Sequence, residues 1–171
     1  MPLTDLRAYI DHLRGLGEIQ DVAAPVALDL ELGAIVRRCY ETGSPAPLFS
    51  AFSDHPAGFR ILGAPAGLSR QPGRQLVRVA ASLDMPADST GRDIVAALAG
   101  SLDRPAIDPV VVDAAPCFEN VAVGDAVDLT RLPVPQLHCG DGGRYLNTWG
   151  CIVARTPDGA WTNWSIARMM L

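Results

Sequence analysis

The chain has 171 residues, of which 49% are hydrophobic, and it carries a formal net charge of −5 at pH 7. This length and apolar content allow one hydrophobic core, or one core and part of a second, and they exclude an extended disordered tail. All fourteen basic residues are arginine and the longest basic cluster is the pair Arg37 and Arg38, so the charge pattern argues against nucleic acid or an anionic membrane surface as a partner and favours a small molecule or another protein.

Two helices are predicted first. Apolar side chains recur at helical spacing over residues 6–16, behind a possible N-cap at Thr4. A second helix is predicted after Asp29, which can cap its N-terminus. Glycines follow both segments, as is typical of helix ends. The glycines that can end them are Gly15, Gly17 and Gly43, the last followed by Pro45, and the apolar face of the second helix consists of Leu32, Ile35, Val36 and Cys39.

Short strands and two further helices are predicted next. Residues 48–52 and 59–62 are apolar runs separated by a His-Pro turn, which is typical of two strands. Residues 76–83 and 94–102 return to helical spacing, and Thr90 can cap the second of these helices. The N-terminal half is therefore predicted to be an α/β domain.

A domain boundary is predicted near residue 108. Two prolines break the helical pattern in residues 103–109, and short β-prone runs separated by turns follow from Val110 onward. The first of these runs is residues 121–125. We therefore expect an α/β leader domain over residues 1–108 and a second, β-rich domain that begins at residue 109 and is incomplete at residue 171.

A β-hairpin is predicted close to the C-terminus. Residues 149–156 and 161–168 are its strands, and Pro157, Asp158 and Gly159 form its turn. In a straight strand Asn163 and Arg168 differ by an odd number of positions, so their side chains would face opposite ways. Both can contact one ligand only if the strand bulges or curls.

The second hairpin strand contains unusual polar chemistry. Asn163 offers a neutral amide oxygen that suits Mg²⁺ or Mn²⁺, and Arg168 can grip a phosphate or carboxylate through two parallel hydrogen bonds. Such a metal needs about six oxygen-type donors, so most of its ligands would come from elsewhere. From residue types alone, the alternative that both are ordinary polar residues of a half-exposed strand stays open.

The chain resembles the UbiD-like decarboxylases. The N-terminal likeness runs from residues 5–10 through residues 15–18 to residues 47–49, so it covers essentially the whole chain but only the first third or so of a typical family member. The Trp-Ser-Ile-Ala-Arg run after Asn163 is closer to the ferulate and cinnamate type than to the ubiquinone-pathway type. The C-terminal likeness comprises, in order, residues 129–135, His138, residues 140–145, residues 148–150, residues 157–159 and residues 162–168.

This resemblance implies a fold and a reaction. The second domain would hold the first strands of a split β-barrel like that of flavin reductases. The reaction would be reversible, non-oxidative decarboxylation of an unsaturated or aromatic carboxylic acid on prenylated FMN, with Mn²⁺ and K⁺ bridging the cofactor phosphate to the protein. Asn163 would be a metal ligand and Arg168 the catalytic arginine beside the substrate carboxylate. The residues that would contact the cofactor are Asn163, Trp164, Ser165, Ile166, Ala167 and Arg168.

Three hypotheses on function follow. The family's other metal ligands, a His and a Glu, its catalytic glutamates and its lysine have no counterpart after Arg168, and the chain has no lysine. The favoured hypothesis is that the chain is the N-terminal portion of a decarboxylase. This portion would be inert alone, and the full-length enzyme would be a homo-oligomer. The alternatives are a small subunit that needs a second polypeptide and a noncatalytic flavin-binding or assembly module.

Other motifs carry weaker signals. Residues 140–143, Gly-Asp-Gly-Gly, lack the last glycine of a dinucleotide-binding motif and the lysine of a P-loop, so a loop between strands is expected. His138 beside Cys139 has no second pair to complete a zinc site. The absence of paired cysteine motifs, of a signal peptide and of a long apolar run predicts a cytoplasmic protein with reduced thiols.

Overall fold

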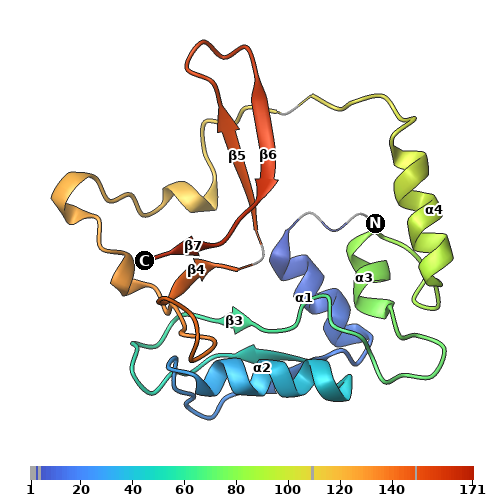
Figure 1. The fold of residues 1–171 in the computed structure, drawn as a ribbon, viewed down its shortest axis with the longest axis horizontal. Coiled ribbons are helices and arrows are strands. Elements are labelled where there is room, and N and C mark those ends of the chain that lie inside the picture. The colour runs from blue at the N-terminus through green and yellow to red at the C-terminus, as the bar shows by residue number, and fades with distance from the viewer. Residues whose placement is uncertain (1–2, 4, 109, 149) are drawn as a thin grey trace.

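The computed structural model describes residues 3, 5–108, 110–148 and 150–171 (Figure 1). The N-terminal part contains four helices and a three-stranded sheet, with α1 and α2 packed against the sheet and α3 against α1. In the C-terminal part, short 3₁₀ turns are followed by two separate two-stranded ladders. The hairpin of β5 and β6 projects away from the N-terminal layers in Figure 1, and the described part of the chain is therefore a folded α/β unit with a more open β-rich extension.

Helix α1 (Leu6–Gly15) is the first predicted helix, and it is confirmed. The Asp5 side chain caps it by accepting a hydrogen bond of 2.8 Å from the Ala8 backbone N–H. The predicted cap, Thr4, lies outside the described residues. Gly17 has a φ of 73°, a left-handed conformation that favours glycine and turns the chain towards the sheet.

Helix α2 (Glu31–Thr42) is also confirmed, but its predicted cap is wrong. The N-cap position is Leu30, with a φ of 64°, and no side chain caps it. The Glu31 carboxylate instead accepts a hydrogen bond of 2.7 Å from the Ala27 backbone N–H. Asp29 pairs through its backbone with Gln136, so tertiary contact determines how this helix begins. Gly43 ends the helix in the left-handed conformation, as predicted.

The sheet has the order β1-β2-β3. Strand β1 (Ile19–Val22) is parallel to β2 (Ala46–Phe49), and β2 is antiparallel to β3 (Ile61–Leu62). Parallel strands need a crossover, which α2 provides. β1 was not predicted because two of its four residues are polar and its pattern is short. The core between α2 and the sheet contains Val26, Leu28, Leu32, Phe49 and Phe52, with Val22, Ile35, Val36, Ile61 and Leu137 packed around it.

Helices α3 (Val77–Ser82) and α4 (Gly91–Ser101) complete the N-terminal part and confirm the predicted helices. The Thr90 side chain accepts a hydrogen bond from the Asp93 backbone N–H, and the Asp93 carboxylate accepts one from the Thr90 backbone N–H. This reciprocal capping box confirms the predicted cap. None of the helices in the described ranges is long and apolar enough to cross a bilayer.

The C-terminal part begins with turns and not with the predicted strand. The expected strand at residues 121–125 is wrong, because Gly124, with a φ of 58°, starts a 3₁₀ turn. Strands appear only later, as β4 (Tyr145–Asn147), β5 (Cys151–Arg155), β6 (Thr162–Ile166) and β7 (Met169–Met170). The three turns that precede these strands are Pro116–Phe118, Gly124–Ala126 and Leu129–Arg131.

The segment before β4 packs on the N-terminal core. The Leu30 N–H donates to the Gln136 carbonyl at 2.9 Å, and the Gln136 N–H donates to the Leu28 carbonyl at 3.0 Å. Val134 is buried beside this pairing. Gly33 in α2 lies so close to the segment that a Cβ built on it would be 2.1 Å from the Leu137 carbonyl oxygen. Glycine at this position is therefore required by a close backbone approach.

Replacing Gly33 by alanine is expected to destabilise the protein by about 1–3 kcal/mol, because the new methyl group forces α2 away from the segment around Leu137. Gly100→Ala in α4 is the matched control, since a Cβ there meets nothing within 4 Å. Helix propensity alone favours alanine over an interior glycine by up to about 1 kcal/mol. Urea unfolding should therefore show opposite signs for the two variants, and equal stabilisation by both would contradict the close approach.

Candidate functional site

The predicted hairpin is present. β5 and β6 pair antiparallel, with Ala154 opposite Asn163 and Val153 opposite Trp164. In the connecting turn the Asp158 carboxylate accepts hydrogen bonds from the Thr156 hydroxyl and the Ala160 backbone N–H. Trp149, placed at the start of the hairpin by the sequence, lies outside the described residues. The turn chemistry thus accounts for the register that positions Asn163.

The residues of β6 alternate between two faces of the hairpin. Asn163 and Ser165 share one face with their neighbours Ala154 and Ile152. Asn163 is half-buried, and no hydrogen bond reaches its side-chain amide from the residues described. On the other face, Trp164 is 70% exposed and Ile166 is 83% exposed. The Asn163 side-chain amide therefore has no partner among the described residues. Trp164 and Ile166 lie on an uncovered apolar face.

The strand that carries the candidate site is interrupted. β6 ends at Ile166, and the chain then joins a different ladder, in which β7 pairs with β4. Ala167 and Arg168 lie at the crossing between the two ladders. In a straight strand the side chains of Asn163 and Arg168 would face opposite ways. Because the strand ends before Arg168, this alternation does not fix the direction of the Arg168 side chain. Within the described ranges, no hydrogen bond or ion pair links Arg168 to Asn163 directly.

Arg168 has two partners that are distant in sequence. Its Nη1 donates to Asp141 Oδ1 at 3.2 Å, and its Cζ lies 4.2 Å from the centre of the Tyr145 ring. The latter distance is that of a cation–π contact. Asp141 also contacts His138, whose Nδ1 is 3.3 Å from Asp141 Oδ2. The structure thus brings together Arg168, Asp141, Tyr145 and His138.

The Asp141 carboxylate is nearly buried, with 13% of its side chain exposed. Desolvation alone would raise its pKa, but the hydrogen bonds and positive charges of Arg168 and His138 outweigh this, and the pKa of Asp141 is lowered from its ordinary value. Asp141 is therefore an anion at neutral pH. The 140–143 loop that carries it leads from the isolated bridge at Gln136 into β4, so the predicted loop is present but only β4 flanks it as a strand. Gly143 allows the Met170 side chain to pack closely against it.

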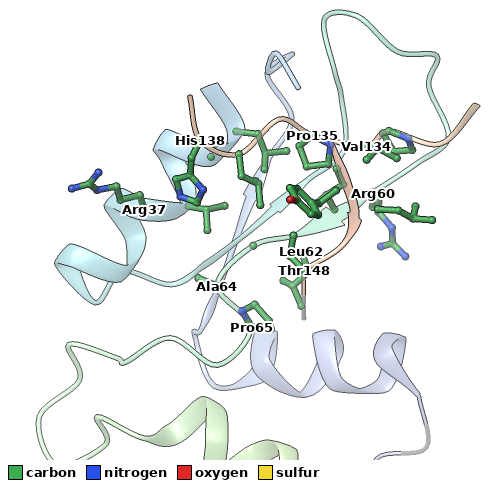
Figure 2. A pocket seen from close by; sticks show the side chains of 18 of the residues that line it. Arg37, Arg60, Leu62, Ala64, Pro65, Val134, Pro135, His138 and Thr148 are labelled. Carbon is green, nitrogen blue, oxygen red and sulfur yellow. The ribbon is translucent and has the colours of Figure 1, made fainter. Parts of the chain in front are cut away.

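A cavity of about 680 Å³ lies beside this cluster (Figure 2). Its walls are mainly apolar and come from α2, the segment around β3, and residues 132–148. In Figure 2, Val134, Pro135 and His138 lie along one edge, opposite Ala64 and Pro65. Tyr145 also lines it, so the residue that contacts Arg168 is part of the cavity wall.

Sequence reasoning did not identify Asp141 and Tyr145 as neighbours of Arg168. The 140–143 loop is visible as a glycine-rich motif, but no spacing rule connects it to a residue 27 positions later.

Metal binding is a separate question from the contacts of Arg168. Over residues 3, 5–108, 110–148 and 150–171, no three His, Cys, Asp or Glu side chains are grouped so that they could hold a metal ion. The role of Asn163 as a metal ligand stays a prediction.

Two sequence profiles of one family match the chain. Residues 10–98 match the N-terminal domain of 3-octaprenyl-4-hydroxybenzoate carboxy-lyase, UbiD, and residues 110–171 match its Rift-related domain. The chain belongs to the UbiD family. The resemblance stated from the sequence motifs is therefore confirmed, and it covers both halves of the chain.

Curated relatives in this family are decarboxylases. The chain is 48% identical over 167 residues to pyrrole-2-carboxylic acid decarboxylase of Pseudomonas aeruginosa. The aligned region covers 98% of the chain and 34% of that protein. It is 35% identical over 173 residues to ferulic acid decarboxylase 1 of Saccharomyces cerevisiae, covering 99% of the chain and 34% of the relative. The UbiD-family chain thus spans about a third of the length of these relatives.

Solved structures share the fold. Vanillic acid decarboxylase of Sedimentibacter hydroxybenzoicus, in its open form, superposes with a TM-score of 0.83 at 23% identity, over 100% of this chain and 35% of that one. An evolved dimeric form of the UbiD-class enzyme HmfF from Pelotomaculum thermopropionicum, in complex with prenylated FMN, gives a TM-score of 0.73 at 26% identity, over 95% and 35% of the two chains. The α/β fold with its β-rich extension is therefore that of UbiD-class decarboxylases.

Proposed function

We propose that this chain is the N-terminal portion of a decarboxylase that removes CO₂ from an unsaturated or aromatic carboxylic acid, with prenylated FMN, Mn²⁺ and K⁺. The observation that carries the proposal is the position of Arg168 in a UbiD-family chain. It lies where the site strand changes ladders, half-exposed, with only one of its terminal nitrogens bonded within the described residues. A planar guanidinium with an open edge suits a carboxylate.

The residues near the hairpin fit the proposed cofactor in part. The Asn163 amide has no partner in the described chain and would supply one oxygen ligand to a hard divalent metal. Residues 163–168 would line the cofactor, which supplies the electron sink for the loss of CO₂ when it is bound. Arg168 would hold the substrate carboxylate in place, and a proton would then replace CO₂ on the substrate carbon.

The exposed apolar surface of the C-terminal part supports a larger assembly. Beyond Ile94, Val134 is the only hydrophobic side chain buried within the described ranges. The hairpin face with Val153, Trp164 and Ile166 is uncovered. A contiguous apolar surface of this kind marks an interaction site. We propose that residues 1–108 form a leader domain and that β4 to β7 begin a split β-barrel. The rest of a decarboxylase would complete this barrel, and the complete enzyme would form a homo-oligomer.

The test is an assay of the complete enzyme that contains this segment. It should be loaded with prenylated FMN, Mn²⁺ and K⁺ and given pyrrole-2-carboxylate, ferulate and cinnamate, with CO₂ release as the readout. Native mass spectrometry of the same preparation identifies bound cofactor and any second polypeptide. Turnover with a separate partner chain would favour the small-subunit alternative. Loaded protein that decarboxylates none of a wider panel of aromatic and acrylic acids would refute the proposed function.

A further inference from the structure

The Arg168 guanidinium is held by two contacts of different kinds. The bond from its Nη1 to Asp141 Oδ1, 3.2 Å long, sets the direction of the group. Arg168 Cζ lies over the Tyr145 ring, 4.2 Å from its centre, which is a cation–π contact. A directional bond and a cation–π contact together restrict the rotation that a half-exposed arginine side chain would otherwise retain.

Asp141 is itself braced. Its second oxygen faces His138 Nδ1 at 3.3 Å, and its backbone N–H donates to the His138 carbonyl at 3.1 Å. The Gln136 side-chain amide donates to the backbone carbonyls of His138 and Asp141, at 3.2 and 3.1 Å. Gln136 is anchored in turn on the N-terminal core through Leu28 and Leu30. A chain of hydrogen bonds therefore connects the α/β core to Arg168.

The arrangement leaves one side of Arg168 available. A guanidinium has five N–H donors, and a carboxylate uses two of them in a parallel pair. Nε and Nη2 of Arg168 have no partner within the described chain, and 53% of the side chain is exposed. Because Asp141 uses only Nη1, the opposite edge remains open to a second carboxylate.

We infer that Asp141 is a positioning residue for Arg168, with the Tyr145 ring as its second support. Asp141 orients the guanidinium so that the Nε and Nη2 edge meets the carboxylate of the acid substrate. This role rests on the proposed function, since it gives Arg168 that substrate class. The pair is not expected to matter for global stability, because Arg168 is half-exposed and water screens its charge.

The first arm of the test measures Arg168 itself, without any assay of activity. Phenylglyoxal modifies accessible arginines, and peptide mass spectrometry gives the rate at Arg168, with Arg104 as an internal reference. Asp141→Asn should raise the relative rate at Arg168 several-fold, because the bonded carboxylate is lost. Asp141→Glu should stay near the wild type. Asp158→Asn is the matched control, since Asp158 contacts Thr156 and Ala160 in the hairpin turn.

Tyr145 provides an independent pair of variants. Tyr145→Phe keeps the ring and should leave the Arg168 rate unchanged, whereas Tyr145→Leu removes the cation–π contact and should raise it. Circular dichroism confirms that each variant is folded. An unchanged Arg168 rate in both folded Asp141→Asn and folded Tyr145→Leu would overturn the positioning role.

The second arm uses the complete, cofactor-loaded enzyme. Asp141→Asn should lower kcat/KM for an acid that the wild type decarboxylates by about ten- to a hundredfold, because small misplacements of a positioning group are costly. Asp141→Glu should recover much of this loss. If the wild type decarboxylates no acid, the proposed function fails, while the labelling rates still decide whether Asp141 holds Arg168. Full activity in Asp141→Asn, with a raised labelling rate, would refute the catalytic relevance of the contact.

Discussion

Replacing Arg168 by alanine in the complete, cofactor-loaded enzyme is expected to lower kcat/KM for its carboxylic acid substrate by about 10²–10³-fold. This is the range seen when one preorganised group that stabilises charge at a reacting centre is removed. The physical reason is that Arg168 has an open pair of donors and a fixed plane, so it can hold a carboxylate with little further ordering. Steady-state measurement of CO₂ release checks the value.

Arg168→Lys is the informative companion. Lysine keeps the charge but has no planar fork and cannot form two parallel hydrogen bonds, so most of the loss should remain. Arg131→Ala is the control, because Arg131 is exposed in the 3₁₀ turn Leu129–Arg131 and lies outside the predicted cofactor run of residues 163–168. The assignment of Arg168 would be wrong if Arg168→Ala retained wild-type turnover of every acid that the enzyme accepts.

Removing one member of the buried pair of Glu18 and Arg78 is expected to destabilise the protein by about 3–5 kcal/mol. Arg78 is 0% exposed and Glu18 is 1% exposed, and Arg78 Nε donates to Glu18 Oε2 at 2.7 Å. Arg78 also donates to the backbone carbonyls of Ala64 and Ser44. Arg78→Met would leave a buried carboxylate without its counter-charge and two carbonyls without this donor.

The surroundings of the pair increase the expected effect. The Ser69 hydroxyl donates to the Glu18 carboxylate at 2.6 Å, so both charged groups belong to one buried network. The Tyr9 hydroxyl donates to the Arg78 carbonyl, and burial raises the pKa of Tyr9 to about 12. The network therefore joins α1, the residue that precedes β1, α3 and the loop around Ala64.

Urea unfolding of four proteins tests this prediction: wild type, Glu18→Leu, Arg78→Met and the double variant. The double variant should be less destabilised than the sum of the single variants, because it leaves no unpaired buried charge. Arg37→Met is the control, since the Arg37–Glu41 pair is exposed and should contribute less than about 1 kcal/mol. Loss of under about 1 kcal/mol from Arg78→Met would contradict the buried network.

Local patterns predicted the helices well. Thr90 and Asp93 form the capping box of α4, and Gly43 ends α2, because caps depend on residues within one turn of the chain. The hairpin turn at Asp158 and Gly159 was predictable for the same reason. The cap of α2 was not, because the backbone of Asp29 pairs with Gln136, more than a hundred residues later.

Short strands were the main failure of prediction. β1 has two polar residues among four, and β7 has only two residues, so neither contains a full alternating pattern. The predicted strand at residues 121–125 had suitable residue types but no partner strand within the described ranges. β-structure depends on pairing with distant segments, and residue preference alone does not specify the partner.

The sequence by itself determined the family, the α/β character of the N-terminal half, and the run from Asn163 to Arg168 as the candidate site, because these depend on motifs and local periodicity. Only the tertiary structure decided that the site strand changes ladders at Ala167, that Asp141 and Tyr145 contact Arg168, and that Gly33 lies against Leu137. The physical reason is that these contacts join residues far apart in the chain, and their geometry arises only when the segments pack together.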